Sequence, residues 1–229
     1  LGAHYGGEAA GCTVIPTSSG NTKRQIQMMK DLGTDILACT PSYALLIADT
    51  AIEMGYDPAV DFKISAGIFG AEPASESMRE DIRKKLGIQY CDVYGLSEVM
   101  GPGVAMECAE SHGLHVAEDH FYAEIVDPDT LKPLPDGEYG ELVFTTLTRE
   151  CCPLVRYRTR DVTRIIPEEC ACGRTHRKID RIVGRTDDML ILRGVNVFPS
   201  QIETVLIAQG YQANYQLIVD RVNNTDTLE

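Results

Sequence analysis

Asp92-Val93-Tyr94-Gly95-Leu96-Ser97-Glu98 follows an apolar run that begins at Ile88 and is typical of a buried strand. The stretch places an aromatic ring, a glycine, a hydroxyl and a carboxylate close together. The Tyr94 ring could stack on a flat heterocycle, Gly95 lets the backbone approach a ligand, and the Glu98 carboxylate could hold a hard cation such as Mg²⁺. This combination suits a nucleotide-binding loop, although the same residue types also serve ordinary turns.

Apolar runs and helical patterns alternate on both sides of this stretch. A helix is predicted in each interval between two runs, and we expect loops that follow parallel strands to converge on one cleft. The pattern therefore predicts βαβ units and a parallel sheet, with the loops at Thr40-Pro41, Gly70 to Glu72 and Tyr94 to Glu98 at one edge. The expected strands are 11–16, 35–39, 64–69 and 88–93, and the expected helices are 22–32, with Thr22 as the cap, 43–54 and 75–86.

The pattern changes at about Phe121 to short strands separated by turns, expected over 122–126, 141–145 and 154–166. A further strand over 189–192 and a helix over 199–209 follow. We therefore expect an α/β fold: a parallel βαβ sheet unit over 1–107, an antiparallel β unit over 108–187, and the start of a small α+β C-terminal domain over 188–229.

Composition excludes several classes of protein. A net charge of −13 argues against nucleic acid as a partner. No apolar run has the length of a membrane span, and no export signal is recognisable. Eight cysteines without such a signal indicate reduced thiols. We expect a cytoplasmic protein with no nucleic-acid or membrane partner.

The cysteines fall into two groups. Cys12, Cys39 and Cys91 lie within expected strands and are interpreted as small core residues. Cys170 and Cys172 lie in a polar, glycine-flanked segment that resembles a metal knuckle and needs two more ligands. We predict a closed structural zinc site with Cys108 and His115 as those ligands, against free surface thiols as the alternative. The histidines that compete with His115 are His112, His120 and His176.

Arginines are concentrated between Arg156 and Arg193, in a chain that is otherwise acidic. They indicate either an anion site or a set of ordinary surface ion pairs. Asp161 lies within this run and should stay ionised beside arginine. Its carboxylate could accept hydrogen bonds from ribose hydroxyls.

Five ordered motifs resemble the phenylacetate–CoA ligases, a branch of the adenylate-forming enzymes. The resemblance runs from Tyr5 to about Leu206, and its narrowest element is Y-G-L-S-E-V-M-G-P-G. The motifs are 94–103, Gly70-Ala71-Glu72-Pro73, 156–161, 184–189, and 193–199 with Glu203 after it.

The resemblance implies an ATP-dependent aryl-acid–CoA ligase, with phenylacetate as the expected acid. ATP, AMP, Mg²⁺ and CoA are the implied cofactors, and a homodimer is allowed. Ser97 would contact the α-phosphate, Glu98 would hold Mg²⁺, Asp187 would be the hinge of a mobile C-terminal domain and Gly194 would approach CoA. The implied nucleotide site also includes Gly70, Ala71, Glu72, Pro73, Asp92, Val93, Tyr94, Gly95, Asp161 and Arg185. The implied acyl pocket comprises Tyr43, Ile68, Phe69, Met100, Gly101 and Pro102.

The family's phosphate loop and catalytic lysine have no counterpart in these residues. We therefore expect a fragment of a longer enzyme that is inactive alone. Two alternatives stay open: an adenylate-forming enzyme for another acid or acceptor, such as a deazaflavin, and a zinc-stabilised binding module without activity.

Overall fold

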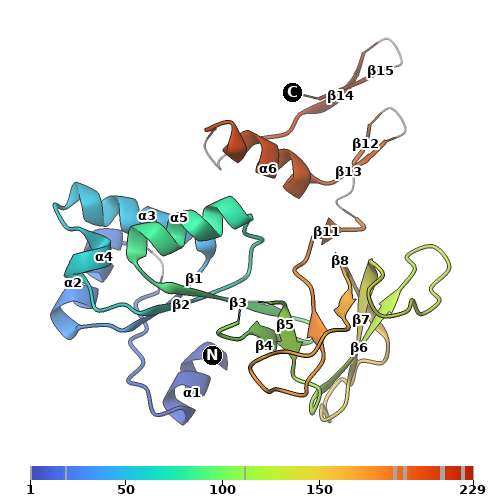
Figure 1. The fold of residues 1–229 in the computed structure, drawn as a ribbon, viewed down its shortest axis with the longest axis horizontal. Coiled ribbons are helices and arrows are strands. Elements are labelled where there is room, and N and C mark those ends of the chain that lie inside the picture. The colour runs from blue at the N-terminus through green and yellow to red at the C-terminus, as the bar shows by residue number, and fades with distance from the viewer. Residues whose placement is uncertain are drawn as a thin grey trace. The chain divides into compact units, whose positions relative to one another are not determined.

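The computed structural model describes residues 2–18, 20–110, 112–187, 190–192, 195–211, 215–222 and 225–228 (Figure 1). The chain divides into two compact units. The first comprises residues 1–117 and 169–176, and the second comprises residues 118–168 and 177–229. Among the described residues, no helix has the length and apolar character that a membrane span requires.

The first unit is an α/β structure, and its strands lie in one sheet in the order β1-β2-β3-β4-β5. Strands β1, β2 and β3 are parallel, whereas β4 and β5 continue the sheet in antiparallel fashion. Helices α3 and α5 pack side by side along β1 to β3 (Figure 1). The strands are β1 (Ile36–Cys39), β2 (Ala66–Phe69), β3 (Gln89–Leu96), β4 (Met100–Glu107) and β5 (Leu114–Val116). The helices are α1 (Gly2–Ala9), α2 (Thr22–Leu32), α3 (Pro41–Glu53), α4 (Pro58–Asp61) and α5 (Glu76–Leu86).

Capping residues explain why the three long helices begin where they do. The Thr40 hydroxyl accepts from the backbone N–H of Tyr43 at the start of α3, and the Ser75 hydroxyl caps α5 in the same way. For α2 the cap is Asn21 and not the predicted Thr22, which is the first helical residue. Gly33 and Gly87 end α2 and α5 in the left-handed conformation that glycine adopts without strain. Helices α1 and α4 were not predicted.

The strand predicted over 11–16 is absent, because residues 12–16 have no regular structure. Cys12 is exposed, so its interpretation as a core residue is wrong. The β-branched pair Thr13-Val14 favours extended backbone, but none of the described strands pairs with it. Among the described residues, the parallel part of the sheet comprises β1, β2 and β3.

The predicted loop at Tyr94 is instead part of a strand. Strand β3 continues through Leu96 and pairs with β4, with Tyr94 opposite Ala105 and an irregularity between Tyr94 and Leu96. Residues 100–103 begin β4. A Cβ at Gly95 would lie 2.6 Å from the Met100 carbonyl oxygen, so glycine allows the two strands to approach this closely. Only residues 97–99 form the turn.

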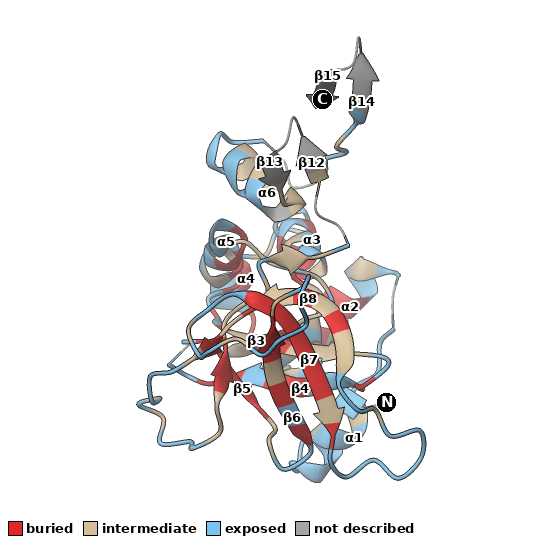
Figure 2. Cartoon of the chain, turned by 90° about the vertical axis from the view of Figure 1, so that its right-hand side faces the viewer, coloured by how far each residue is buried: buried red, intermediate tan, exposed pale blue. Residues whose placement is uncertain are grey.

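The second unit contains an antiparallel sheet of order β11-β8-β7-β6. Strands β6 and β7 are buried along most of their length (Figure 2). The antiparallel unit predicted after Phe121 is confirmed, although the run over 154–166 forms strand only from Tyr157. The strands are β6 (Phe121–Val126), β7 (Gly140–Thr146), β8 (Tyr157–Thr163), β9 (Ile165–Ile166), β10 (Lys178–Ile179), β11 (Gly184–Arg185), β12 (Leu190–Leu192), β13 (Val195–Val197), β14 (Val219–Val222) and β15 (Thr225–Leu228), with one helix, α6 (Pro199–Ala208).

Candidate nucleotide and metal sites

The tip of the β3–β4 hairpin exposes polar residues of the 92–98 motif to solvent. Ser97 and Glu98 are exposed in the turn, and Tyr94 and Gly95 are half-buried at the end of β3. The backbone N–H of Val99 donates to the Leu96 carbonyl and closes the turn at 3.1 Å. A hydroxyl and a carboxylate therefore project from a paired, hydrogen-bonded strand end.

The segment after β2 lies against this hairpin. A Cβ at Gly70 would overlap the Val93 carbonyl oxygen, so Gly70 packs directly on β3. Ala71 follows with a φ of 71°, a conformation that costs energy for a residue with a Cβ. The Glu72 carboxylate accepts a 2.5 Å hydrogen bond from the backbone N–H of Ser42 in the first turn of α3, and Pro73 is exposed. The structure thus brings Gly70 and Val93 together.

Residues expected in the acyl pocket have different environments. Ile68 is half-buried, whereas Phe69 is 0% exposed and its ring packs on Tyr90 at 4.5 Å between centroids. As neighbours in β2, the two side chains point to opposite faces of the sheet. The Tyr43 hydroxyl is hydrogen-bonded to the Thr22 hydroxyl at 3.1 Å. The other members, Met100, Gly101 and Pro102, are exposed in β4.

In the second unit, three predicted residues form one cluster. Asp161 in β8 lies opposite Arg185 in β11, whose Nη1 donates to the buried Asp161 carboxylate at 3.2 Å. Nε and Nη2 of the same guanidinium donate to both oxygens of Asp187 at 2.8 and 2.9 Å. These bonds lower the pKa of the exposed Asp187 carboxyl. Gly194 lies outside the described residues.

The arginine-rich run forms ion pairs at several of its members. Nε and Nη2 of Arg158 both donate to Glu141, whose side chain is fully buried. Similar pairs join Arg156 to Glu124, Arg164 to Asp180 and Arg177 to Glu118. These four arginines form ion pairs, as one of the two interpretations expects, although the pair of Arg158 with the fully buried Glu141 is not a surface pair.

The four predicted zinc ligands lie together in the first unit. Their ligand atoms are all within 4.8 Å of one another. The Cys108 and Cys170 sulfurs are 3.6 Å apart, and the Cys172 sulfur is 3.4 Å from His115 Nε2. Sulfurs bound to one tetrahedral zinc at about 2.3 Å would lie about 3.8 Å from each other. The donor set and its spacing therefore fit such an ion.

Surrounding groups prepare these side chains for metal binding. His115 Nδ1 lies 3.1 Å from the His176 carbonyl oxygen, to which it can donate only as the tautomer that leaves Nε2 free. The backbone N–H of Arg174 donates to the Cys172 sulfur and lowers its pKa to about 7, which favours the thiolate. At Cys108 burial acts in the opposite direction and raises the pKa of the thiol. Outside the cluster, burial also raises the pKa of Cys39, to about 12, as expected for an unreactive thiol.

The competing histidines do not join this cluster. His112 is exposed, His120 Nδ1 bonds the Thr148 hydroxyl at 2.8 Å in the second unit, and His176 contributes its carbonyl oxygen. The predicted choice of His115 agrees with the described geometry.

Sequence reasoning missed Arg79, which is fully buried and contacts both Asp92 and Glu107. A signal for it exists. Arg79, Ile82 and Leu86 have the i, i+3, i+7 spacing of one helix face, and the last two are core residues of α5. An arginine on an apolar face indicates a buried ion pair.

Comparison with solved structures identifies the class of protein that has this fold. The chain has the fold of an acyl-CoA ligase: it superposes on 2-hydroxyisobutyryl-CoA ligase in complex with R3-HIB-AMP with a TM-score of 0.91 at 28% identity, covering 99% of this chain and 49% of that one. A more distant structure, the anthranilate CoA ligase AuaEII, shares the fold with a TM-score of 0.66 at 16% identity, over 95% of this chain and 43% of that one.

The family model for AMP-binding enzymes matches residues 3–147, and that for the AMP-binding enzyme C-terminal domain matches residues 194–229. The chain therefore belongs to the AMP-binding enzyme family. Phenylacetate-coenzyme A ligases of Pseudomonas putida and Escherichia coli (strain K12) are each 53% identical to it over 100% of its length. The chain spans about half the length of these relatives, 52% of each.

Proposed function

We propose that the whole protein is an ATP-dependent aryl-acid–CoA ligase of the phenylacetate type. In the first half-reaction, a carboxylate oxygen of the acid bonds to the α-phosphorus of ATP and pyrophosphate leaves. In the second, the CoA thiol, having lost its proton, bonds to the acyl carbon and AMP leaves. The observation that carries this proposal is the 48–53% identity to four phenylacetate-coenzyme A ligases along the whole chain.

The β3–β4 hairpin and the segment after β2 would hold the nucleotide. In this proposal Tyr94 stacks on adenine, the backbone at 70–73, Asp92, Val93 and Gly95 frames it, and Ser97 hydrogen-bonds the α-phosphate. The exposed Glu98 carboxylate offers the hard oxygen ligands that Mg²⁺ prefers. Bound there, Mg²⁺ would neutralise charge on the phosphates.

Asp161, Arg185 and Asp187 would supply the ribose contacts and the hinge. Asp161 accepts hydrogen bonds from the ribose hydroxyls, Arg185 reaches the ribose or phosphate, and Asp187 is the hinge residue. Gly194 begins the segment that approaches CoA. A large domain ending at 187 and a small domain over 188–229 are supported by the separate family model that begins at residue 194.

The acid would bind beside Tyr43, Ile68, Phe69 and residues 100–102. Met100 is 47% exposed and offers an apolar surface to an aryl ring. Because Phe69 is covered, it would support this pocket from the core. The likeness to 2-hydroxyisobutyryl-CoA ligase favours a different, smaller acid as the second candidate.

The cysteine–histidine cluster would hold one structural zinc. Three sulfurs and one imidazole form a closed, soft ligand set, and such sites stabilise loops without taking part in chemistry. Zinc would fix residues 169–176 onto β4 and β5 of the first unit. The cytoplasmic location and the homodimer rest on sequence alone and stay predictions.

Thioester formation by the whole protein tests the ligase. Purified protein would be mixed with ATP, Mg²⁺, CoA and either one of three acids, namely phenylacetate, benzoate and 2-hydroxyisobutyrate, or a deazaflavin as an alternative acceptor, and the products identified by mass spectrometry. We expect phenylacetyl-CoA as the main product. A product with another acid alone would support the second candidate, and no product with any acid would support a binding module.

A further inference from the structure

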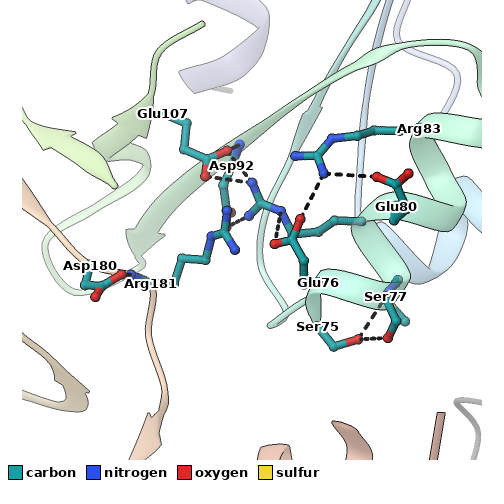
Figure 3. Close-up of polar contacts among 11 residues, drawn as sticks. Ser75, Glu76, Ser77, Glu80, Arg83, Asp92, Glu107, Asp180 and Arg181 are labelled. Atoms are coloured by element: carbon teal, nitrogen blue, oxygen red, sulfur yellow. Dashed lines mark hydrogen bonds and ion pairs between the residues drawn. The ribbon is translucent and has the colours of Figure 1, made fainter. Parts of the chain in front are cut away.

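Arg79 joins helix α5 to both strands of the hairpin. Its guanidinium is 0% exposed, and Nη2 lies 2.6 Å from each carboxylate oxygen of Glu107 in β4. Nη1 donates to the Asp92 carboxylate in β3 at 3.1 Å. Figure 3 shows Asp92 and Glu107 on neighbouring strands, facing the α5 helix that carries Glu76 and Arg83. The Arg79 side chain therefore links three elements of the first unit, namely α5, β3 and β4.

Glu107 strengthens this connection. Besides contacting Arg79, its carboxylate accepts a 2.9 Å hydrogen bond from the backbone N–H of Asp92. Asp92 is also the residue where β3 pairs in parallel with Phe69 of β2, one position before Val93 pairs in antiparallel with Met106 of β4. The cluster thus lies where the sheet changes from parallel to antiparallel.

The orientation of the guanidinium is fixed by an aromatic ring. Arg79 lies over the Tyr90 ring at 4.2 Å, and Tyr90 is itself buried against Phe69. A planar fork that stacks on a ring and bonds two carboxylates is a geometry that lysine cannot reproduce. Substitution by lysine would keep the charge and lose the geometry.

We propose that Arg79 is a positioning residue for nucleotide binding. It holds Asp92 and Glu107 in place and so sets the path of β3 toward Tyr94, Ser97 and Glu98, the residues that would contact the nucleotide. This role rests on the proposed ligase function. Ligand contacts must be placed to within fractions of an ångström, so a small shift of the hairpin should weaken ATP binding.

The test compares Arg79→Lys with Arg83→Lys in the whole enzyme. Arg83 is on the same helix, is partly exposed and pairs with Glu76 and Glu80 at the surface. We expect Arg79→Lys to raise the KM for ATP about tenfold or more, with the KM for CoA unchanged, and Arg83→Lys to change neither. A purely structural role would lower the amount of active enzyme, measured by active-site titration, with the KM for ATP unchanged.

Glu107→Gln provides a second variant should Arg79→Lys fail to fold. It keeps the side-chain volume, weakens the contact with Arg79 and should raise the KM for ATP in the same direction. A KM for ATP within twofold of the wild type in the folded variants would overturn the positioning role. Absence of acid-dependent pyrophosphate exchange in the wild type would instead refute the ligase itself, and this role with it.

Discussion

Gly95 lies where the backbones of strands β3 and β4 approach each other too closely to admit a Cβ. An added Cβ would lie 2.6 Å from the Met100 carbonyl oxygen and 3.0 Å from the Pro102 Cα, both backbone atoms that cannot rotate away. Gly101, on the facing strand, has no atom within 3.9 Å of the same construction. Two glycines of one hairpin therefore have different structural requirements.

Gly95→Ala should destabilise the protein by about 1–3 kcal/mol, because overlap with backbone forces the strands apart. Gly101→Ala is the matched control and should change stability by less than about 1 kcal/mol. Urea denaturation followed by circular dichroism measures both. Equal stability of the two variants would show that the hairpin tolerates a wider separation.

Asp187 provides a test in the second unit. Its hydrogen bonds from Arg185 hold the pKa of the carboxyl below the ordinary value of 3.8. A group with a lowered folded pKa stabilises the fold above its unfolded pKa, and this contribution is lost as the pH falls through the folded pKa. We expect NMR titration to give a pKa below 3.8 that returns toward 3.8 in Arg185→Gln. An Asp187 pKa that does not respond to this substitution would exclude the pair in solution.

At the scale of elements, the sequence predicted best where local chemistry is decisive. Helices α2, α3 and α5 were expected close to their observed positions because the periodic spacing of their apolar residues marks them. The turn-like composition of Met100-Gly101-Pro102-Gly103 concealed the beginning of β4. That strand exists because β3 pairs with it, and local composition does not record such pairing.

The candidate sites show the same difference between features that local sequence marks and features that depend on residues distant along the chain. The four members of the cysteine–histidine cluster were identifiable because a polar C-x-C segment needs partners and few histidines were available. Arg79 was not identified, because its partners Asp92 and Glu107 are distant along the chain. The different burial of Ile68 and Phe69 likewise follows from the position of β2 in the sheet.

The predicted zinc site would join the segment 169–176 to strands β4 and β5. Elemental analysis should give about one zinc per chain, and a chelator should lower the melting temperature, because an ion that binds only the folded state stabilises it. Cys170→Ser should lose most of the zinc, whereas Cys12→Ser, which changes an exposed cysteine outside the cluster, should keep it. Full zinc content in Cys170→Ser would contradict the ligand set.

At the scale of the molecule, the chain covers about half of its relatives' length. We therefore predict that residues 1–229 alone form no phenylacetyl-CoA under conditions in which the whole protein does, as measured by mass spectrometry. Thioester formation by the isolated chain would contradict this.

The β3–β4 hairpin is proposed to be the nucleotide site of an acid-activating enzyme. Phenylacetate-dependent exchange of labelled pyrophosphate into ATP, measured on the whole protein and on Glu98→Gln, tests it most directly. We predict exchange in the wild type and a loss of about 100-fold or more in the variant, which removes the carboxylate proposed to hold Mg²⁺. Undiminished exchange in Glu98→Gln would contradict the proposed site, and no exchange in the wild type would contradict the proposed activity.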